Sequence, residues 1–227
     1  MYIEYFETFT FIIIVCSVFF GGIVKGSVGI GMSMFSVPLI AFILPPTKAM
    51  MLLCFPVIIT NFIQMDIKRG ISNYRFFPMF ISLFIGILIG GKLILNLDLK
   101  TISIIIALTI IIFTLINFLG LNLNNLNAKY EKKLSIIIGF CSGILGGMST
   151  FYAPPIITFL VSLHLEKENF IRTIATMYFL ASIPLYSSLI YHGLGNFYDL
   201  LFSFGITDQK FINIDMLLSF LLIIYNK

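Results

Sequence analysis

The sequence predicts an all-α polytopic membrane protein of two inverted structural repeats, each opening with a Gly-rich broken or re-entrant helical hairpin. Of its 227 residues, 59% are hydrophobic and 11% are charged, whereas soluble domains carry about 25% charged residues. The mean hydropathy is +1.06. So few charges cannot cover so apolar a chain, and the net charge of +4 is therefore interpreted as setting membrane orientation, with no nucleic acid as partner.

Nine apolar segments follow one another along the chain, and several approach the roughly 20 residues that cross a bilayer. The second segment would make only about 20 Å of helix, which is short for a hydrocarbon core of about 30 Å. We expect helices over residues 9–24, 32–44, 48–65, 77–97 and 99–121, and then over 134–147, 150–163, 170–191 and 212–225.

A Gly-rich stretch occurs twice, which predicts two homologous halves. The first copy is GGIVKGSVGIGMSMFSVP at 21–38, and the second reads GFCSGILGGMSTFYAPP. The repeats are expected over 1–121 and 134–227, joined by a cytoplasmic linker at 122–133. A shift of 117 positions places Gly22 on Gly139, Gly26 on Gly143, Gly29 on Gly146 and Pro38 on Pro155.

Basic residues in two loops predict the orientation. Positively charged loops favour the cytoplasmic side. The chain is therefore expected in the cell's inner membrane with its N-terminus on the outer side, and its two halves are expected to be inverted relative to each other. Inverted repeats are common in secondary transporters, with the binding site at the midplane. The basic residues are Lys68, Arg69 and Arg75 in one loop and Lys129, Lys132 and Lys133 in the other.

The glycines predict helix breaks inside the membrane. Irregular backbone at that depth is stable only when it is buried in protein or lines a wet cavity, and glycine permits positive φ. We expect breaks at GSVGIG and GILGGMST, helices resuming at Met32 and Thr150, and two tips that meet near the membrane centre and bind an anion. The candidate binding residues are Gly26, Ser27, Gly29, Gly31 and Ser33, and in the second copy Gly143, Gly146, Gly147, Ser149 and Thr150.

Three further polar residues are candidates for anion binding. Lys25 lies within the first motif, where a lysine at membrane depth is costly and so suggests a function; its ammonium could instead extend to the interface. Arg172 could attract the anion or mark the cytoplasmic interface. Asn61 could line the cavity or make an ordinary interhelical hydrogen bond. No His/Cys cluster suggests a metal site, and no cofactor is expected.

Three stretches carry a family resemblance: GGIVKGSVGIGMSMFSVPLIAFILPPTKA, IIGFCSGILGGMSTFYAPPIITFL and ENFIRTIATMYFLAS. They resemble the TauE/SafE family of membrane transporter proteins over most of the chain. The resemblance implies transport, through export, of a small anion such as sulfite, a sulfonate or a related organic acid. It also implies a last helix matching 99–121, which this chain is expected to lack. In the second copy Met148 stands where Gly31 stands in the first.

The leading interpretation is a secondary transporter or facilitator that works by alternating access around a midplane site, with a small anion and the lipid bilayer as partners. It is not expected to be an enzyme, because two peripheral histidines and no buried acidic pair leave acid–base chemistry without its groups. A membrane assembly factor stays open as an alternative, because Gly faces also suit helix docking. An intramembrane thiol relay through Cys16 and Cys141 is weaker, because the two are not at matching positions. The oligomeric state stays open.

Overall fold

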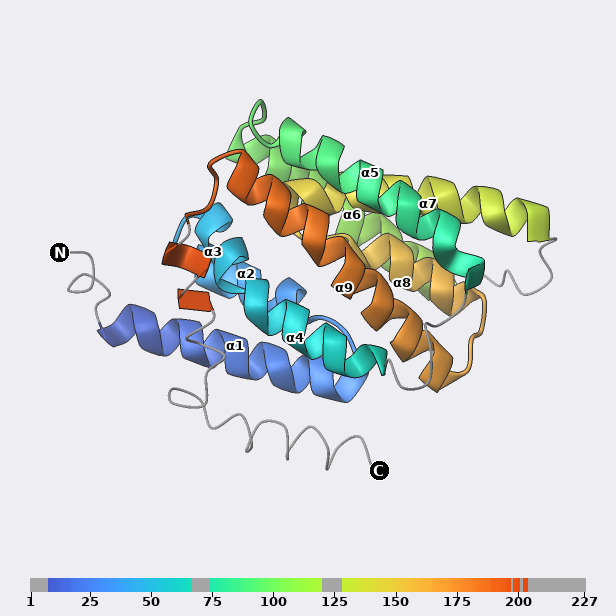
Figure 1. Cartoon of the computed structure of the whole chain (residues 1–227), viewed down its shortest axis with the longest axis horizontal. Coiled ribbons are helices and arrows are strands. Elements are labelled where there is room, and N and C mark those ends of the chain that lie inside the picture. Colours follow the sequence, from blue (N-terminus) through green and yellow to red (C-terminus); the bar gives the residue numbers. More distant parts are fainter. Residues whose placement is uncertain (1–7, 67–73, 120–127, 197, 201, 204–227) are drawn as a thin grey trace. The chain divides into compact units, whose positions relative to one another are not determined.

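The computed structural model describes residues 8–66, 74–119, 128–196, 198–200 and 202–203. Every regular element in this described part is helical (Figure 1), which confirms the all-α prediction. The expected helix at 212–225, the N-terminal residues 1–7, the linker residues 122–127, and Lys68 and Arg69 lie outside the described residues.

The chain forms two compact units, which comprise residues 1–60 with 193–227 and residues 61–192. These units do not coincide with the predicted repeats 1–121 and 134–227. The reason is that α5 (Phe77–Leu93), from the first predicted repeat, packs along α7 (Ala128–Ser149), from the second.

The first unit is built on α1 (Thr8–Val28) and α2 (Met32–Ala41), and α2 lies back along α1. The Ser36 hydroxyl donates a hydrogen bond to the Ser17 carbonyl oxygen at 2.8 Å. Gly21 permits this close approach, because a Cβ there would meet the Ser36 hydroxyl oxygen. The unit also contains α3 (Pro46–Leu52) and the start of α4 (Cys54–Met65).

The second unit is built on α5 and α7, which run parallel and side by side (Figure 1). Position 79 faces 139, position 83 faces 143 and position 87 faces 147, so both helices advance in the same direction. The unit also contains the short 3₁₀ helix η2 (Tyr74–Phe76), α6 (Leu99–Phe118), α8 (Ala153–Ser162) and α9 (Lys167–Tyr191).

Glycine makes the α5–α7 contact possible. A Cβ on Gly143 would meet the Leu83 carbonyl oxygen and lie 2.8 Å from the Gly86 Cα. A Cβ on Gly147 would lie 2.6 Å from the Gly91 nitrogen. Small residues four apart let membrane helices bring their backbones together. Gly139, Gly143 and Gly147 therefore form a packing face against α5.

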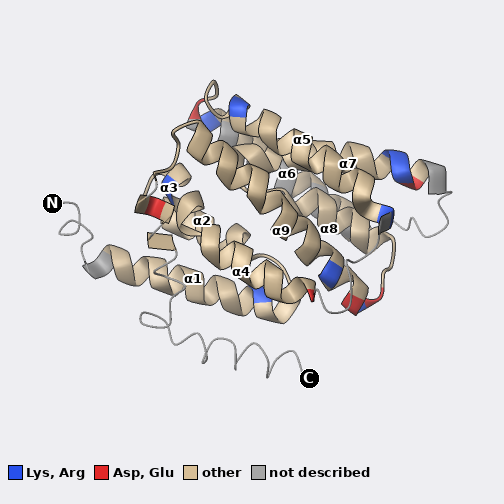
Figure 2. Ribbon diagram, in the orientation of Figure 1, with Lys and Arg blue, Asp and Glu red and all other residues tan. Residues whose placement is uncertain are grey.

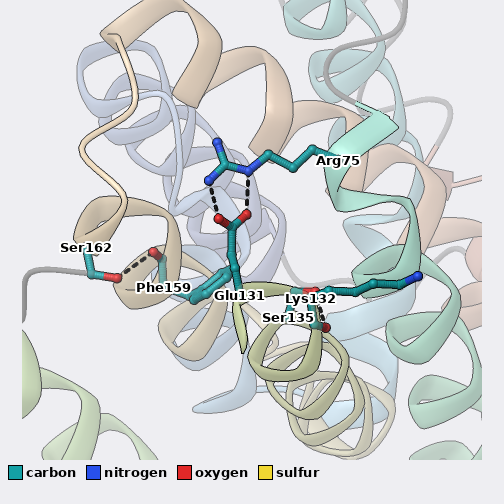
Figure 3. Close-up of polar contacts among 6 residues, drawn as sticks. All are labelled: Arg75, Glu131, Lys132, Ser135, Phe159 and Ser162. Carbon is teal, nitrogen blue, oxygen red and sulfur yellow. Dashed lines mark hydrogen bonds and ion pairs between the residues drawn. The ribbon is translucent and has the colours of Figure 1, made fainter. Parts of the chain in front are cut away.

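An ion pair joins the starting ends of these two helices (Figure 3). Arg75, in η2 just before α5, donates from Nε and Nη2 to the two carboxylate oxygens of Glu131 in the first turn of α7. This bidentate geometry is the strongest form of such a pair. The hydrogen bonds to Glu131 raise the pKa of Arg75 above its ordinary value. The starting ends of α5 and α7 are thus linked across the helix pair.

The start of α6 is defined by an N-cap. The Asp98 carboxylate accepts hydrogen bonds from the Thr101 hydroxyl at 2.5 Å and from the Thr101 amide at 3.2 Å. These bonds lower the pKa of Asp98 from its ordinary value. An N-cap carboxylate satisfies one of the amides that a helix start leaves unbonded.

The described charges lie mostly near helix ends and leave apolar central stretches (Figure 2). Among the described helices, α1 over Thr10–Val28 and α9 are long and apolar enough to cross a membrane. The helices α3 and α4 meet the same criterion together, as a pair bent by 43°. The predicted segment 48–65 is therefore two helices, and α7 begins at Ala128, inside the predicted linker.

Replacing Gly143 with Ala should destabilise the protein, because the new methyl group would press on backbone atoms of α5 that cannot move aside. Overpacking of this kind costs about 1–3 kcal/mol. The thermal midpoint of the purified protein in detergent is the measurement. Cys141→Ala, on the exposed side of the same helix, is the control, and equal midpoints for the two variants would contradict the packing face.

Replacing Arg75 with Gln should also lower the thermal midpoint, because the Glu131 side chain is only 10% exposed and would lose its partner. Since Arg75 itself is 50% exposed, we expect a loss of about 1–2 kcal/mol. Adding Glu131→Gln to this variant should recover part of the loss. If Arg75→Gln and the wild type have the same thermal midpoint, the ion pair contributes nothing to stability.

Candidate functional site

The first helix break spans residues 29–31, between the end of α1 at Val28 and the start of α2 at Met32. Gly29 has φ 86° and Gly31 has φ 101°, both in the region that favours glycine. The Gly29 amide still donates to the Lys25 carbonyl oxygen at 2.7 Å and closes the last turn of α1. The predicted resumption of the helix at Met32 is confirmed.

The start of α2 presents amide donors beside this break. The bond from the Phe35 amide to the Gly31 carbonyl oxygen, at 3.0 Å, belongs to the first turn of the helix. The amides of Met32, Ser33 and Met34 come before it, and the first amides of a helix have no acceptor within the helix. They carry the partial positive charge of the helix N-terminus, which favours an anion.

Lys25 lies in the last turn of α1, four residues before Gly29, and is 5% exposed. A cation is favourable at a helix C-terminus because of the macrodipole. A buried lysine in an apolar segment is still costly, and such residues usually serve a function. The first break therefore has amide donors at the start of α2 and a buried lysine one turn before it.

The second break spans residues 150–152, between the end of α7 at Ser149 and the start of α8 at Ala153. The break therefore begins only at the last residue of GILGGMST, because α7 continues through the glycines, and the expected helix start at Thr150 is wrong. Thr150 has φ 64°, a left-handed conformation that costs a β-branched residue about 1–3 kcal/mol. Its amide donates to the Gly146 carbonyl oxygen at 2.7 Å.

The two breaks match each other in a register of 121 positions. Gly29 and Thr150 each follow a helix end, have positive φ and bond to the carbonyl four residues earlier. The shift of 117 positions that aligns the glycines in the sequence is about one helical turn shorter than this structural register. In the structural register Lys25 corresponds to Gly146, and Gly31 corresponds to Tyr152.

The second break offers fewer amides than the first and more hydroxyl groups. Pro154 and Pro155 occupy the second and third positions of α8 and have no N–H to donate. Thr150 is 4% exposed and Tyr178, in α9, is 6% exposed. Within the described part of the chain neither hydroxyl has a hydrogen-bond partner. Buried hydroxyls in this state are uncommon and call for an explanation.

In the first copy, three of the predicted binding residues lie at the break. Gly29 and Gly31 form it, and Ser33 is half-buried in the first turn of α2. Gly26 and Ser27 belong to α1, and the exposed Ser27 hydroxyl donates to the Val24 carbonyl oxygen at 2.9 Å.

In the second copy, Thr150 alone of the predicted residues has a hydroxyl without a partner at the break, among the described residues. Gly143 and Gly147 pack against α5, and a Cβ on Gly146 would lie 2.7 Å from the Tyr152 ring. The Ser149 hydroxyl donates to the Leu145 carbonyl oxygen at 2.7 Å and accepts from the Phe151 amide at 3.3 Å. These residues shape the break more directly than they offer groups to a ligand.

The remaining predicted residues belong to other helices. Asn61 is buried in α4, and Arg172 is half-buried in the second turn of α9. Their part in binding stays a prediction.

Sequence reasoning missed Tyr152 and Tyr178. Their ring centroids lie 4.8 Å apart with the planes at 77°, an edge-to-face arrangement typical of stable aromatic pairs. Tyr152 lies two residues before the double proline of α8, which was a usable signal. No spacing in the sequence linked it to Tyr178 on α9.

The apolar helices, of which α1 and α9 are long enough to cross a membrane, are those of an integral membrane protein. The chain matches the model of the family described as Sulfite exporter TauE/SafE over residues 14–222. It therefore belongs to this family, whose members are transporters rather than enzymes, and the predicted resemblance is confirmed. No curated protein and no solved structure matches the chain. Membership implies membrane transport of sulfur-containing anions.

Proposed function

We propose that the protein exports a small anion, such as sulfite, a sulfonate or a related organic acid, across the cell's inner membrane by alternating access around a midplane site. The observation that carries this proposal is the pair of matching helix breaks in a member of a transporter family. Irregular backbone inside an apolar segment is stable where it lines a water-filled path.

The chemistry of the first break supports an anion as the substrate. The helix N-terminus at Met32 presents amide donors beside the break, and Lys25 lies in the last turn of the helix before it. Backbone amides and an ammonium group both stabilise negative charge. Sulfite, sulfonates and carboxylates all present oxygen atoms that such donors can bind.

The placement of carboxylates supports a mechanism without a carboxylate relay. Among the described residues, Asp and Glu lie at helix ends or between helices, as with Asp66, Asp98 and Glu131. The membrane potential acts on each transported charge with about 2.3 kcal/mol per 100 mV. An anion leaving a cell that is negative inside gains this energy, so export needs no coupled ion.

The orientation proposed is the N-terminus outside and the basic starting ends of α5 and α7 inside. The parallel course of α5 and α7, joined at these ends by Arg75 and Glu131, supports a common side for both. Positive residues in short loops favour the cytoplasm. In this orientation the second half is inverted relative to the first.

Anion flux in proteoliposomes tests the proposal. An imposed membrane potential should drive flux of at least one of sulfite, sulfoacetate and lactate through the wild-type protein. Lys25→Ala should slow this flux about tenfold or more, because a bond from a charged donor to an anion contributes about 1.5–3 kcal/mol.

The matched control is Lys48→Ala, which removes an exposed lysine in α3 and should leave the rate unchanged. Purified fractions with equal monodispersity should be compared, so that folding defects are not read as transport defects. An absence of potential-driven flux for all three anions would sink the transport proposal.

A further inference from the structure

The second helix break contains an arrangement that packing alone does not explain. The hydroxyl groups of Thr150 and Tyr178 are both buried, and neither has a hydrogen-bond partner within the described residues. A buried hydroxyl without a partner is destabilising, since it gives up its bonds to water and receives nothing in return. Thr150 lies in the break, and the Tyr178 ring contacts Tyr152 of the same break, which points to a partner that binds there.

Tyr178 is held in place by the aromatic pair. Its ring meets Tyr152 edge to face with centroids 4.8 Å apart. The Tyr152 ring in turn lies over Gly146, where a Cβ would come within 2.8 Å of the Tyr152 Cβ. The Gly146 backbone and the Tyr152 ring thus fix the position of the Tyr178 ring without using the Tyr178 hydroxyl.

Thr150 adds a second sign of function. Its φ of 64° is the conformation that the first copy gives to a glycine, Gly29, at the corresponding position. A β-branched side chain is strained there, and glycine would remove the strain. Strained residues that persist are concentrated at binding sites, and the group that distinguishes Thr150 is its hydroxyl.

The first copy carries a reciprocal substitution. Where the second copy has Gly146 on the helix and Tyr152 in the break, the first has Lys25 on the helix and Gly31 in the break. The first copy therefore has a lysine on the helix where the second has glycine, and the second has a tyrosine in the break where the first has glycine. That tyrosine is paired with a second tyrosine, Tyr178.

The geometry points to a subsite in the second unit that binds an oxyanion through uncharged donors. In it the hydroxyls of Thr150 and Tyr178 donate hydrogen bonds to oxygen atoms of a sulfonate-type anion. This inference rests on the proposed function and names the residues that would select the substrate. Hydroxyl donors bind oxyanions directionally, and the Tyr152 ring holds the Tyr178 ring in position.

The test is ligand binding by the purified full-length protein, measured as the thermal shift on titration with sulfite and with sulfoacetate. Tyr178→Phe and Thr150→Val each remove one hydroxyl and keep the side-chain shape. Each should raise the dissociation constant about ten- to hundredfold, as expected for a lost bond to a charged group.

The thermal midpoints without ligand separate binding from structure. Because neither hydroxyl has a partner in the described structure, both variants should melt no lower than the wild type. Tyr186→Phe, the same deletion at a buried tyrosine on α9, is the control and should keep the wild-type dissociation constant.

Two results would overturn the inference, and they are distinct. If the wild type binds and both variants bind equally well, the subsite is refuted and the transport proposal stands. If the wild type binds neither anion, the subsite is refuted as well, and the flux assay with sulfite, sulfoacetate and lactate decides the transport proposal separately.

Discussion

The structure depends on one constraint, which is that backbone N–H and C=O groups in hydrocarbon must find partners within the protein. Helices meet this requirement along most of the described chain. At residues 29–31 and 150–152 they stop, although the sequence on both sides stays apolar. Left-handed residues let the chain turn at these points while the preceding helix keeps its last hydrogen bond. Both breaks thus leave polar groups where a membrane segment normally has none, and these groups are what a transported ion can use.

The same glycine-rich motif serves two purposes in its two copies. In the first copy, Gly29 and Gly31 form the break itself. In the second, Gly143 and Gly147 bring α7 against α5, and the break comes one turn later at Thr150. The donors diverge as well, since amides precede Phe35 in α2 whereas prolines occupy the corresponding part of α8.

The sequence predicted the helical class, the membrane environment and the family, because composition and apolar length report these directly. It also placed the start of α2 correctly, where glycine with positive φ precedes Met32. It misplaced the second break, because a glycine that packs against a neighbouring helix and a glycine that ends a helix look alike in sequence. The Tyr152–Tyr178 pair could not be predicted, because it depends on the packing of α9, far away in the chain.

The most direct test of the central claim is water access to the breaks. The background is a protein in which Ala replaces Cys16, Cys54 and Cys141. Single cysteines are then placed at Ile30 and at Phe151, and each protein is treated with a water-soluble maleimide in proteoliposomes. The account predicts that both react, that sulfoacetate slows the reaction, and that a cysteine at the exposed position Phe84 of α5, which we expect to face lipid, reacts much more slowly. Break cysteines that react no faster than the one at Phe84 would contradict it.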